Sequence, residues 1–143
     1  MLKGINPLLS PELLYVLAAM GHGDELAIVD CNFPAASIGK KTIRLDGANL
    51  IEACAAIVGL MPLDTFVDHP ICRMEVVGDP SAIPSVQAEF LDTCESLEGR
   101  ALKVSSLSRE EFYERAKHAF AVVATAEQRP YGCFLLVKGV INV

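Results

Sequence analysis

The chain has 143 residues and a formal net charge of −6 at pH 7, a length that fits one domain with its own hydrophobic core. Hydrophobic residues make up 52% of the sequence, yet no apolar run approaches the roughly 20 residues of a membrane span, and no Lys- or Arg-rich run offers the basic surface of a nucleic-acid-binding protein. We therefore expect a single domain over residues 1–143, with neither a membrane nor a nucleic-acid partner, and with its apolar excess buried in a sheet or between subunits.

The first half of the chain alternates helices with short apolar strands. Ser10 and Pro11 are typical of a helix start, and Gly21 can end that helix in a left-handed conformation. The apolar run Leu26–Val29 is typical of a central strand covered on both faces, and Asp30 follows its carboxyl end. The elements expected here are a helix from residue 11 towards 21, strands at 26–29 and 42–44, and a helix at 48–58.

The second half continues the alternation. Ser108 and Glu111 fit a capping box at the start of a helix that runs to about His118. The other elements expected here are strands at 71–77, 103–105, 120–124 and 134–137, and a helix through residues 86–97. A short polar turn joins the last two strands, which predicts a hairpin. The whole order predicts an α/β fold, a three-layer α/β/α sandwich with a mixed, mostly parallel sheet.

Two side chains next to the strand at 26–29 are candidates for chemistry. His22 lies between two glycines, and histidine is the side chain whose ordinary pKa lies nearest physiological pH, so His22 is an acid/base candidate. Asp30 supplies a carboxylate. The alternative interpretation is ordinary hydrogen bonding at strand ends.

Arg109 and the segment Tyr131-Gly132-Cys133 are further candidates. Arg109 lies in the first turn of a helix, where the dipole disfavours a cation, so its donors are either used for a ligand or paired with an acid such as Glu110. Tyr131 and Gly132 offer a phenol and a close backbone approach, which suit a hydroxyl-rich ligand. The alternative there is a simple entry into the last strand.

Other common chemistries have no signature in this sequence. The five cysteines are odd in number and lack a CxxC pair, which is not the pattern of a disulfide framework or a zinc site. No basic segment followed by an apolar signal core opens the chain, so we expect a cytoplasmic location. Nucleotide-binding glycine motifs and a nucleophile elbow are missing. We expect a reaction without a metal or a cofactor.

Several segments, in the same order along nearly the whole chain, resemble the RbsD/FucU family of sugar mutarotases, and among them its fucose branch. The segments are MGHGDE at 20–25, NFPA at 32–35, IRLDG at 43–47, PLDT at 62–65, FYERAK at 112–117 and AFAVVAT at 119–125.

The resemblance implies an activity and a role for each candidate. The protein would interconvert the α and β anomers of L-fucose or a related pyranose, with His22 as proton donor. Sugar contacts would come from Asp30, Arg109 and the segment of Tyr131, Gly132 and Cys133. Cys133 departs from the pattern, since the family usually has Asn there.

The resemblance also implies an assembly of subunits. The family has a helix-flanked sheet and forms rings, often decamers in bacteria, with sites near subunit boundaries. We therefore expect a homo-oligomer, with a decamer as one possibility. Two alternatives stay open: a ribose-type pyranase that exchanges pyranose and furanose forms, and a monosaccharide-binding protein without catalysis.

Overall fold

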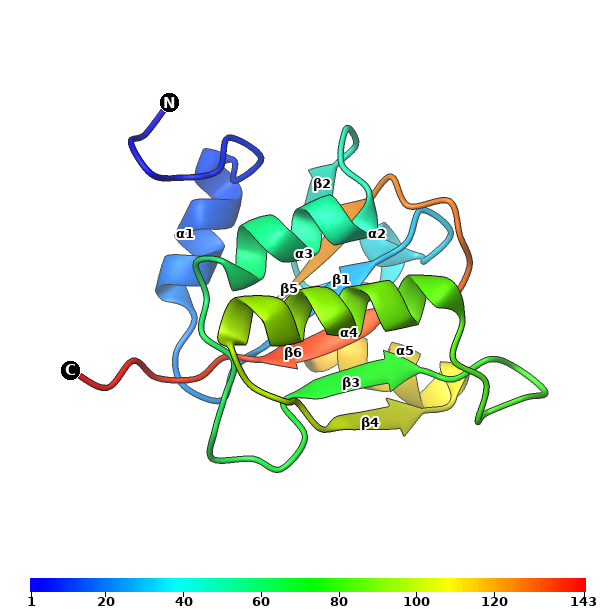
Figure 1. The fold of residues 1–143 in the computed structure, drawn as a ribbon. Coiled ribbons are helices and arrows are strands. Elements are labelled where there is room, and N and C mark those ends of the chain that lie inside the picture. Colours follow the sequence, from blue (N-terminus) through cyan, green and yellow to red (C-terminus); the bar gives the residue numbers. More distant parts are fainter.

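The computed structural model describes all residues from 1 to 143, folded around one six-stranded sheet (Figure 1). The strands lie in the order β2-β5-β1-β6-β3-β4 and are β1 (Glu25–Val29), β2 (Thr42–Leu45), β3 (Ile71–Met74), β4 (Val104–Leu107), β5 (Ala121–Thr125) and β6 (Phe134–Val137). The helices are α1 (Pro11–Ala19), α2 (Ala35–Ile38), α3 (Leu50–Val58), α4 (Ser85–Glu98) and α5 (Arg109–His118).

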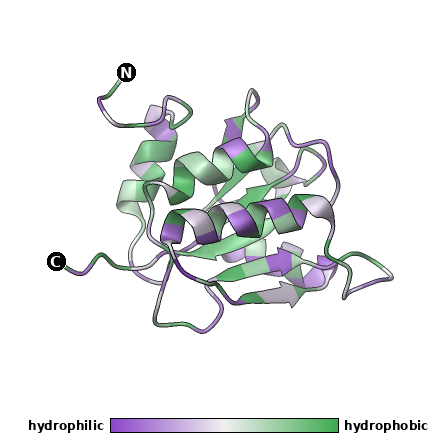
Figure 2. Ribbon diagram, in the orientation of Figure 1, coloured by the Kyte–Doolittle hydropathy of each residue, from purple (hydrophilic) through white to green (hydrophobic).

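Helices cover both faces of the sheet, which confirms the three-layer prediction. Residues of α1, α3 and α4 form one hydrophobic cluster with one face of the sheet, and residues of α2 and α5 form a second cluster with the other face. Figure 2 shows the consequence for the sequence: the inner strands are mostly hydrophobic, whereas α4 also carries polar residues. Phe90 of α4 stacks on Phe134 of β6 at a centroid distance of 3.8 Å, in the middle of the first cluster.

The predicted hairpin of the last two strands is wrong. Strand β1 lies between β5 and β6, parallel to β5 and antiparallel to β6. The connection is therefore a crossover past the carboxyl end of β1, where the amide of Cys31 donates to the carbonyl of Glu127 at 2.9 Å. The sheet is mixed all the same, because β6 is also antiparallel to β3 while β3 and β4 are parallel.

Capping residues and other local sequence signals predicted most element boundaries to within a few residues. Ser10 caps α1, and the predicted capping box at Ser108 and Glu111 is formed. The first helix ends earlier than expected, because Met20 is extended, and the left-handed glycine of this turn is Gly23 with φ +86° rather than Gly21. Strand β3 also stops at Met74, so that the residues up to α4 form a long loop.

Candidate active site

His22 stands at the amino end of β1 and pairs with a buried carboxylate. Its Nε2 lies 2.9 Å from Oδ1 of Asp64, which comes from the loop after α3. The Asp64 side chain is 1% exposed and that of His22 is 42% exposed. The loop of His22 is fixed by backbone bonds, since the amide of Gly23 donates to Lys138. The pair thus presents an imidazole ring to solvent on a rigid base.

The environment of Asp64 keeps its carboxyl ionised. Burial acts to raise its pKa, but hydrogen bonds from the amides of Phe66 and Val67 and from His22 together lower the pKa below the ordinary 3.8. An ionised carboxylate only accepts hydrogen bonds, so the Nε2 of His22 carries the shared proton. The other ring nitrogen, Nδ1, is then available for proton exchange with a substrate. The ring of Phe66, 4.9 Å away between centroids, flanks the histidine.

Asp30 is held at the opposite end of β1 by donors from two loops. Its Oδ1 accepts from the amides of Asn32 and Phe33 at 3.0 and 3.1 Å. Its Oδ2 accepts from the amide of Gly132 at 3.1 Å and from the thiol of Cys133 at 3.4 Å. The side chain is almost fully buried. Asp30 is therefore a preorganised acceptor beside the entry into β6, with little freedom to move.

A cavity of about 120 Å³ opens at this end of the sheet. Asp30, Tyr131 and Cys133 line it together with Asn32, Phe33, Met74, Tyr113 and Pro130. Burial raises the pKa of the Tyr113 phenol, which therefore stays a proton-bearing donor. Burial and the nearby Asp30 also raise the pKa of Cys133 well above its ordinary value, so its thiol keeps its proton. The mixture of apolar walls and a few polar groups suits a small hydroxylated ligand.

Arg109 lies next to Tyr113, which lines this cavity, and it makes one of the two contacts that its sequence position predicted, the pairing with an acid; its contact with a ligand stays a prediction. It forms an exposed ion pair with Glu110 at 3.4 Å, and its guanidinium lies 5.7 Å from the centroid of the Tyr113 ring. Exposed ion pairs contribute little to stability. The guanidinium is therefore free to turn towards a ligand held beside Tyr113.

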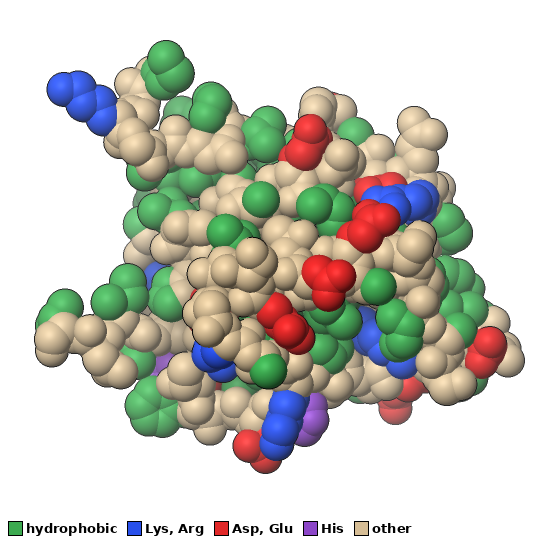
Figure 3. Space-filling view, in the orientation of Figure 1, with side chains coloured by type: hydrophobic (Ala, Val, Ile, Leu, Met, Phe, Trp, Pro, Cys, Tyr) green, Lys and Arg blue, Asp and Glu red, His purple; other side chains and the backbone are tan.

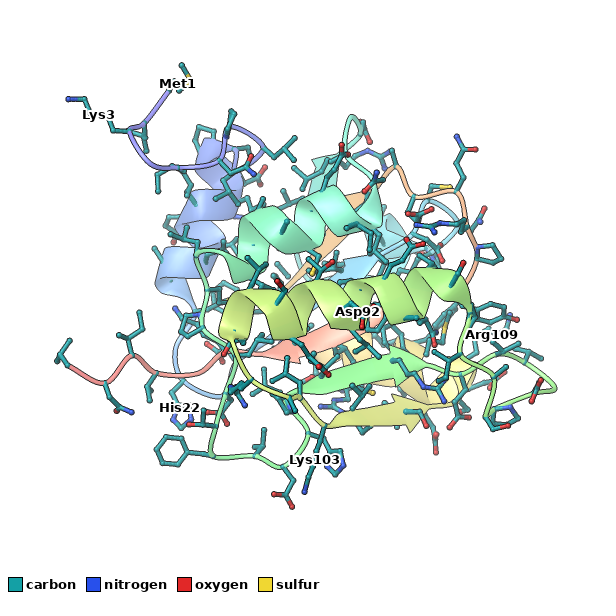
Figure 4. The ribbon with its side chains drawn as sticks, viewed as in Figure 1. Met1, Lys3, His22, Asp92, Lys103 and Arg109 are labelled. Atoms are coloured by element: carbon teal, nitrogen blue, oxygen red, sulfur yellow. The ribbon has the colours of Figure 1, made fainter.

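The structure brings five of the six predicted site residues to one edge of the sheet and leaves His22 at the other. Strand β1 has five residues, or about 15 Å at about 3.3 Å per residue, and Figure 4 shows His22 and Arg109 on opposite sides of the molecule. Hydrogen-bond reach is about 3 Å. Asp30 consequently does not orient His22 within one chain; that role belongs to Asp64.

Asp64 and Tyr113 are two side chains to which the sequence interpretation gave no functional role. Asp64 lies 42 residues from His22, so no spacing rule connects them, although PLDT is one of the segments that carry the family resemblance. Tyr113 lies on a helix whose polar composition is typical of a solvated face. Its inward position follows from α5 packing on the sheet beside Phe33, at a ring centroid distance of 5.0 Å.

With this geometry in place, comparison with known proteins decides the family. The sequence model of the RbsD / FucU transport protein family matches residues 3–141. The chain belongs to the RbsD/FucU family. A relative within this family, the L-fucose mutarotase of Haemophilus influenzae (strain 86-028NP), is 46% identical over 143 residues, which is 100% of this chain and 99% of that one. The L-fucose mutarotase of Histophilus somni (strain 2336) is 43% identical over the same coverage.

Solved structures of RbsD/FucU proteins share the fold. The fucose mutarotase of Streptococcus pneumoniae in complex with L-fucose superposes with a TM-score of 0.91 at 42% identity, over 99% of this chain and 100% of that one. RbsD of Bacillus subtilis complexed with D-ribose gives a TM-score of 0.72 at 26% identity over the same coverage. No helix here is long and apolar enough to cross a membrane, and no three metal-ligating side chains gather in one place.

Proposed function

We propose that this protein is an L-fucose mutarotase, an isomerase that interconverts the α and β anomers of the pyranose. The observation that carries the proposal is the hydrogen bond between Nε2 of His22 and the buried Asp64, which leaves the other ring nitrogen free as an acid/base group. The similarity to L-fucose mutarotases over the full chain supports the choice of sugar.

The reaction moves protons and one C–O bond. His22 gives a proton from Nδ1 to the ring oxygen while a water molecule takes the proton of the anomeric hydroxyl, the bond from C1 to the ring oxygen breaks, and the open aldehyde forms; both proton transfers reverse when the ring closes. Rotation about the C1–C2 bond and closure on either face of the carbonyl return both anomers. Asp64 accepts a hydrogen bond from Nε2 of His22 and so orients the ring, and acid/base assistance of this kind is worth about 10²–10⁴-fold. No step calls for a metal or a cofactor.

The sugar would be held at the other edge of the sheet. Asp30 offers a fixed acceptor for a sugar hydroxyl, while the neutral phenol of Tyr113 and the guanidinium of Arg109 offer donors. The segment of Tyr131, Gly132 and Cys133 closes the cavity around them. The apolar walls suit the C–H faces of a pyranose ring.

A site that is divided in this way needs two chains. We propose that His22 of one subunit reaches the Asp30 cavity of a neighbouring subunit, since about 15 Å of strand separates the two within one chain. Phe66 beside His22 is 73% exposed, as expected of a side chain that a neighbour covers. The assembly is a homo-oligomer, with the decamer expected from the resemblance as the form to test.

A second exposed apolar surface supports the assembly. Figure 3 shows hydrophobic side chains gathered around α1 and the two chain ends. An apolar groove of about 570 Å³ lies there, lined by residues that include Leu2, Ile5, Leu60 and Ile141. We propose that a neighbouring subunit covers this exposed apolar groove. We also propose the cytoplasm as the location, in keeping with five unpaired cysteines.

Exchange NMR tests the function directly. L-Fucose, D-ribose and D-galactose are each mixed with catalytic amounts of the protein, and the rate of exchange between anomers is measured. Fast exchange on L-fucose, and its loss in His22→Ala, is the expected result. His69→Ala is the matched control, since His69 is another exposed histidine that no candidate contact involves. Preference for D-ribose would support the pyranase alternative, and binding of L-fucose without exchange would support the binding-protein alternative.

A further inference from the structure

Arg73 of β3 is a buried cation whose acceptors are all uncharged. It is 8% exposed. Its guanidinium donates to the carbonyls of Pro80 and Ala82 at 2.8 and 3.3 Å and to Oε1 of Gln87 at 3.4 Å. A buried charge is costly, and a hydrophobic residue of similar size would fill the space with less penalty. The placement of Arg73 therefore points to a task other than stability.

Gln87 of α4 connects Arg73 to the sugar cavity. It is fully buried, and its Nε2 donates to the carbonyls of Met74 and Tyr131 at 2.8 and 3.0 Å. An amide group can turn over and exchange its oxygen with its nitrogen, whereas a guanidinium only donates. Arg73 thus fixes the orientation of the Gln87 amide: the amide oxygen faces the guanidinium, and the amide nitrogen donates to the carbonyls of Met74 and Tyr131.

Tyr131 is the residue on which these contacts meet. Its backbone φ of +65° makes it the one residue other than glycine with a positive φ, a conformation that L side chains adopt at a cost. Its carbonyl is held by Gln87. Its hydroxyl accepts from the amide of Val77 at 3.2 Å. Val77 lies in the loop between β3 and α4, and Arg73 donates to two carbonyls of the same loop. The carbonyl of Tyr131 is therefore held by the buried Gln87, and its hydroxyl is held by the loop that Arg73 holds.

We infer that Arg73 and Gln87 act together as positioning residues, which hold Tyr131 in its left-handed conformation so that its side chain walls the sugar cavity and the following amide reaches Asp30. This inference rests on the proposed function. Neither residue lines the cavity, so each acts through Tyr131. The class of ligand that they serve is the monosaccharide that the cavity takes.

The experiment uses Gln87→Met, which keeps the side-chain length and removes both donors. We expect the KM for L-fucose to rise about tenfold, the effect of a hydrogen bond lost from a binding unit, while kcat changes less. Arg73→Met should act in the same way, and the double variant should be no worse than either single one, because the two residues form one unit. Arg73→Lys, which keeps a donor and the charge, should restore part of the affinity. Gln128→Met is the matched control, because Gln128 is an exposed glutamine in the connection between β5 and β6 that also contains Tyr131.

A readout that needs no activity separates this inference from the proposed function. Hydrogen exchange by mass spectrometry should show faster exchange in the peptides that cover residues 75–84 and 129–134 of Gln87→Met. In a Tyr131→Gly background the backbone needs no clamp, since glycine adopts a positive φ readily, so Gln87→Met should raise KM by less than about twofold there.

The possible outcomes are distinct. If the parent protein does not interconvert anomers, the proposed function fails. The amide hydrogen exchange of the two peptides in Gln87→Met still tests the network in that case. Suppose instead that the parent protein is active and that Gln87→Met folds. If this variant then has the same KM and the same amide hydrogen exchange in those peptides as the parent protein, Arg73 and Gln87 have no positioning role. Additive effects of Gln87→Met and Tyr131→Gly on KM would equally overturn the inference, because they would show that Gln87 acts elsewhere.

Discussion

Mixed assemblies of two inactive variants should regain activity. His22→Ala removes the acid at one end of β1, and Asp30→Asn removes the acceptor at the other. Each variant alone should lose most anomer exchange. His22→Ala loses acid/base assistance, which is worth about 10²–10⁴-fold, and Asp30→Asn no longer holds the sugar in a position where the acid can act on it. When both variants are expressed together, some interfaces pair an intact His22 with an intact Asp30 from the neighbouring chain.

The size of the recovery follows from the divided site. With equal amounts and random assembly, about a quarter of the interfaces carry both intact residues, because each partner has a chance of about one half of supplying the required one. The specific activity of the mixture should therefore approach about a quarter of the parent value. A site within one chain would give no recovery at all, since every chain then lacks one of its two groups.

The assay is exchange NMR on L-fucose with assemblies whose composition is read by native mass spectrometry. Variants that are mixed after separate purification form a control, because preformed assemblies that do not trade subunits should stay inactive until they are dissociated and reassembled. Mixed assemblies of confirmed composition that remain inactive would refute the two-chain site. His22 would then have to work without the Asp30 cavity.

Four other changes test the remaining contacts. Asp64→Asn should lower kcat by about tenfold or more in the NMR assay, because the ring of His22 loses its ionised partner, while Asp68→Asn in the same loop should leave it unchanged. Cys133→Asn should alter the KM for L-fucose, measured by initial rates, since an amide is a stronger donor to the adjacent carboxylate than a thiol; an unchanged KM would mean that this side chain is irrelevant to binding. Phe90→Ala should lower the free energy of unfolding by about 3–5 kcal/mol in urea titrations, and a loss below about 1 kcal/mol would contradict the stacked core. The same titrations should show stability falling as the pH drops below about 4, because Asp64 and Glu127 have pKa values lowered by the fold and the unfolded chain therefore binds more protons there.

Much of the fold could be predicted from local signals, and the strand order could not. Apolar runs such as Leu26–Val29 and caps such as Ser108 depend on near neighbours, so they are readable along the chain. The pairing of β1 with both β5 and β6 joins segments about a hundred residues apart and depends on how the whole sheet packs. The short connection before β6 predicted a hairpin, because sequence alone does not show that β1 already occupies the place beside β5.

The site was predictable residue by residue but not as a geometry. His22 and Asp30 were both identified, and their places at the two ends of one strand follow from the length of β1, which the sequence already indicated; the partner of His22 does not follow from it. Asp64 required the folded chain, since only the loop after α3 brings its carboxylate to 2.9 Å from the ring of His22. Local sequence reports side-chain chemistry; it does not report which distant loop supplies a partner.

The two halves of the site differ in rigidity, and the difference links catalysis to assembly. Asp30 is buried and held by four donors within its own chain, so its half is complete before any neighbour arrives. His22 is 42% exposed, and water around a polar contact weakens its electrostatic part. In the proposed assembly, a neighbouring subunit would cover His22 and remove this water, which would strengthen the interaction of His22 with Asp64 and place the ring beside the bound sugar. If the proposed assembly is correct, the isolated chain carries a preformed binding cavity and an exposed histidine, and the contact between subunits is the step that completes the active site.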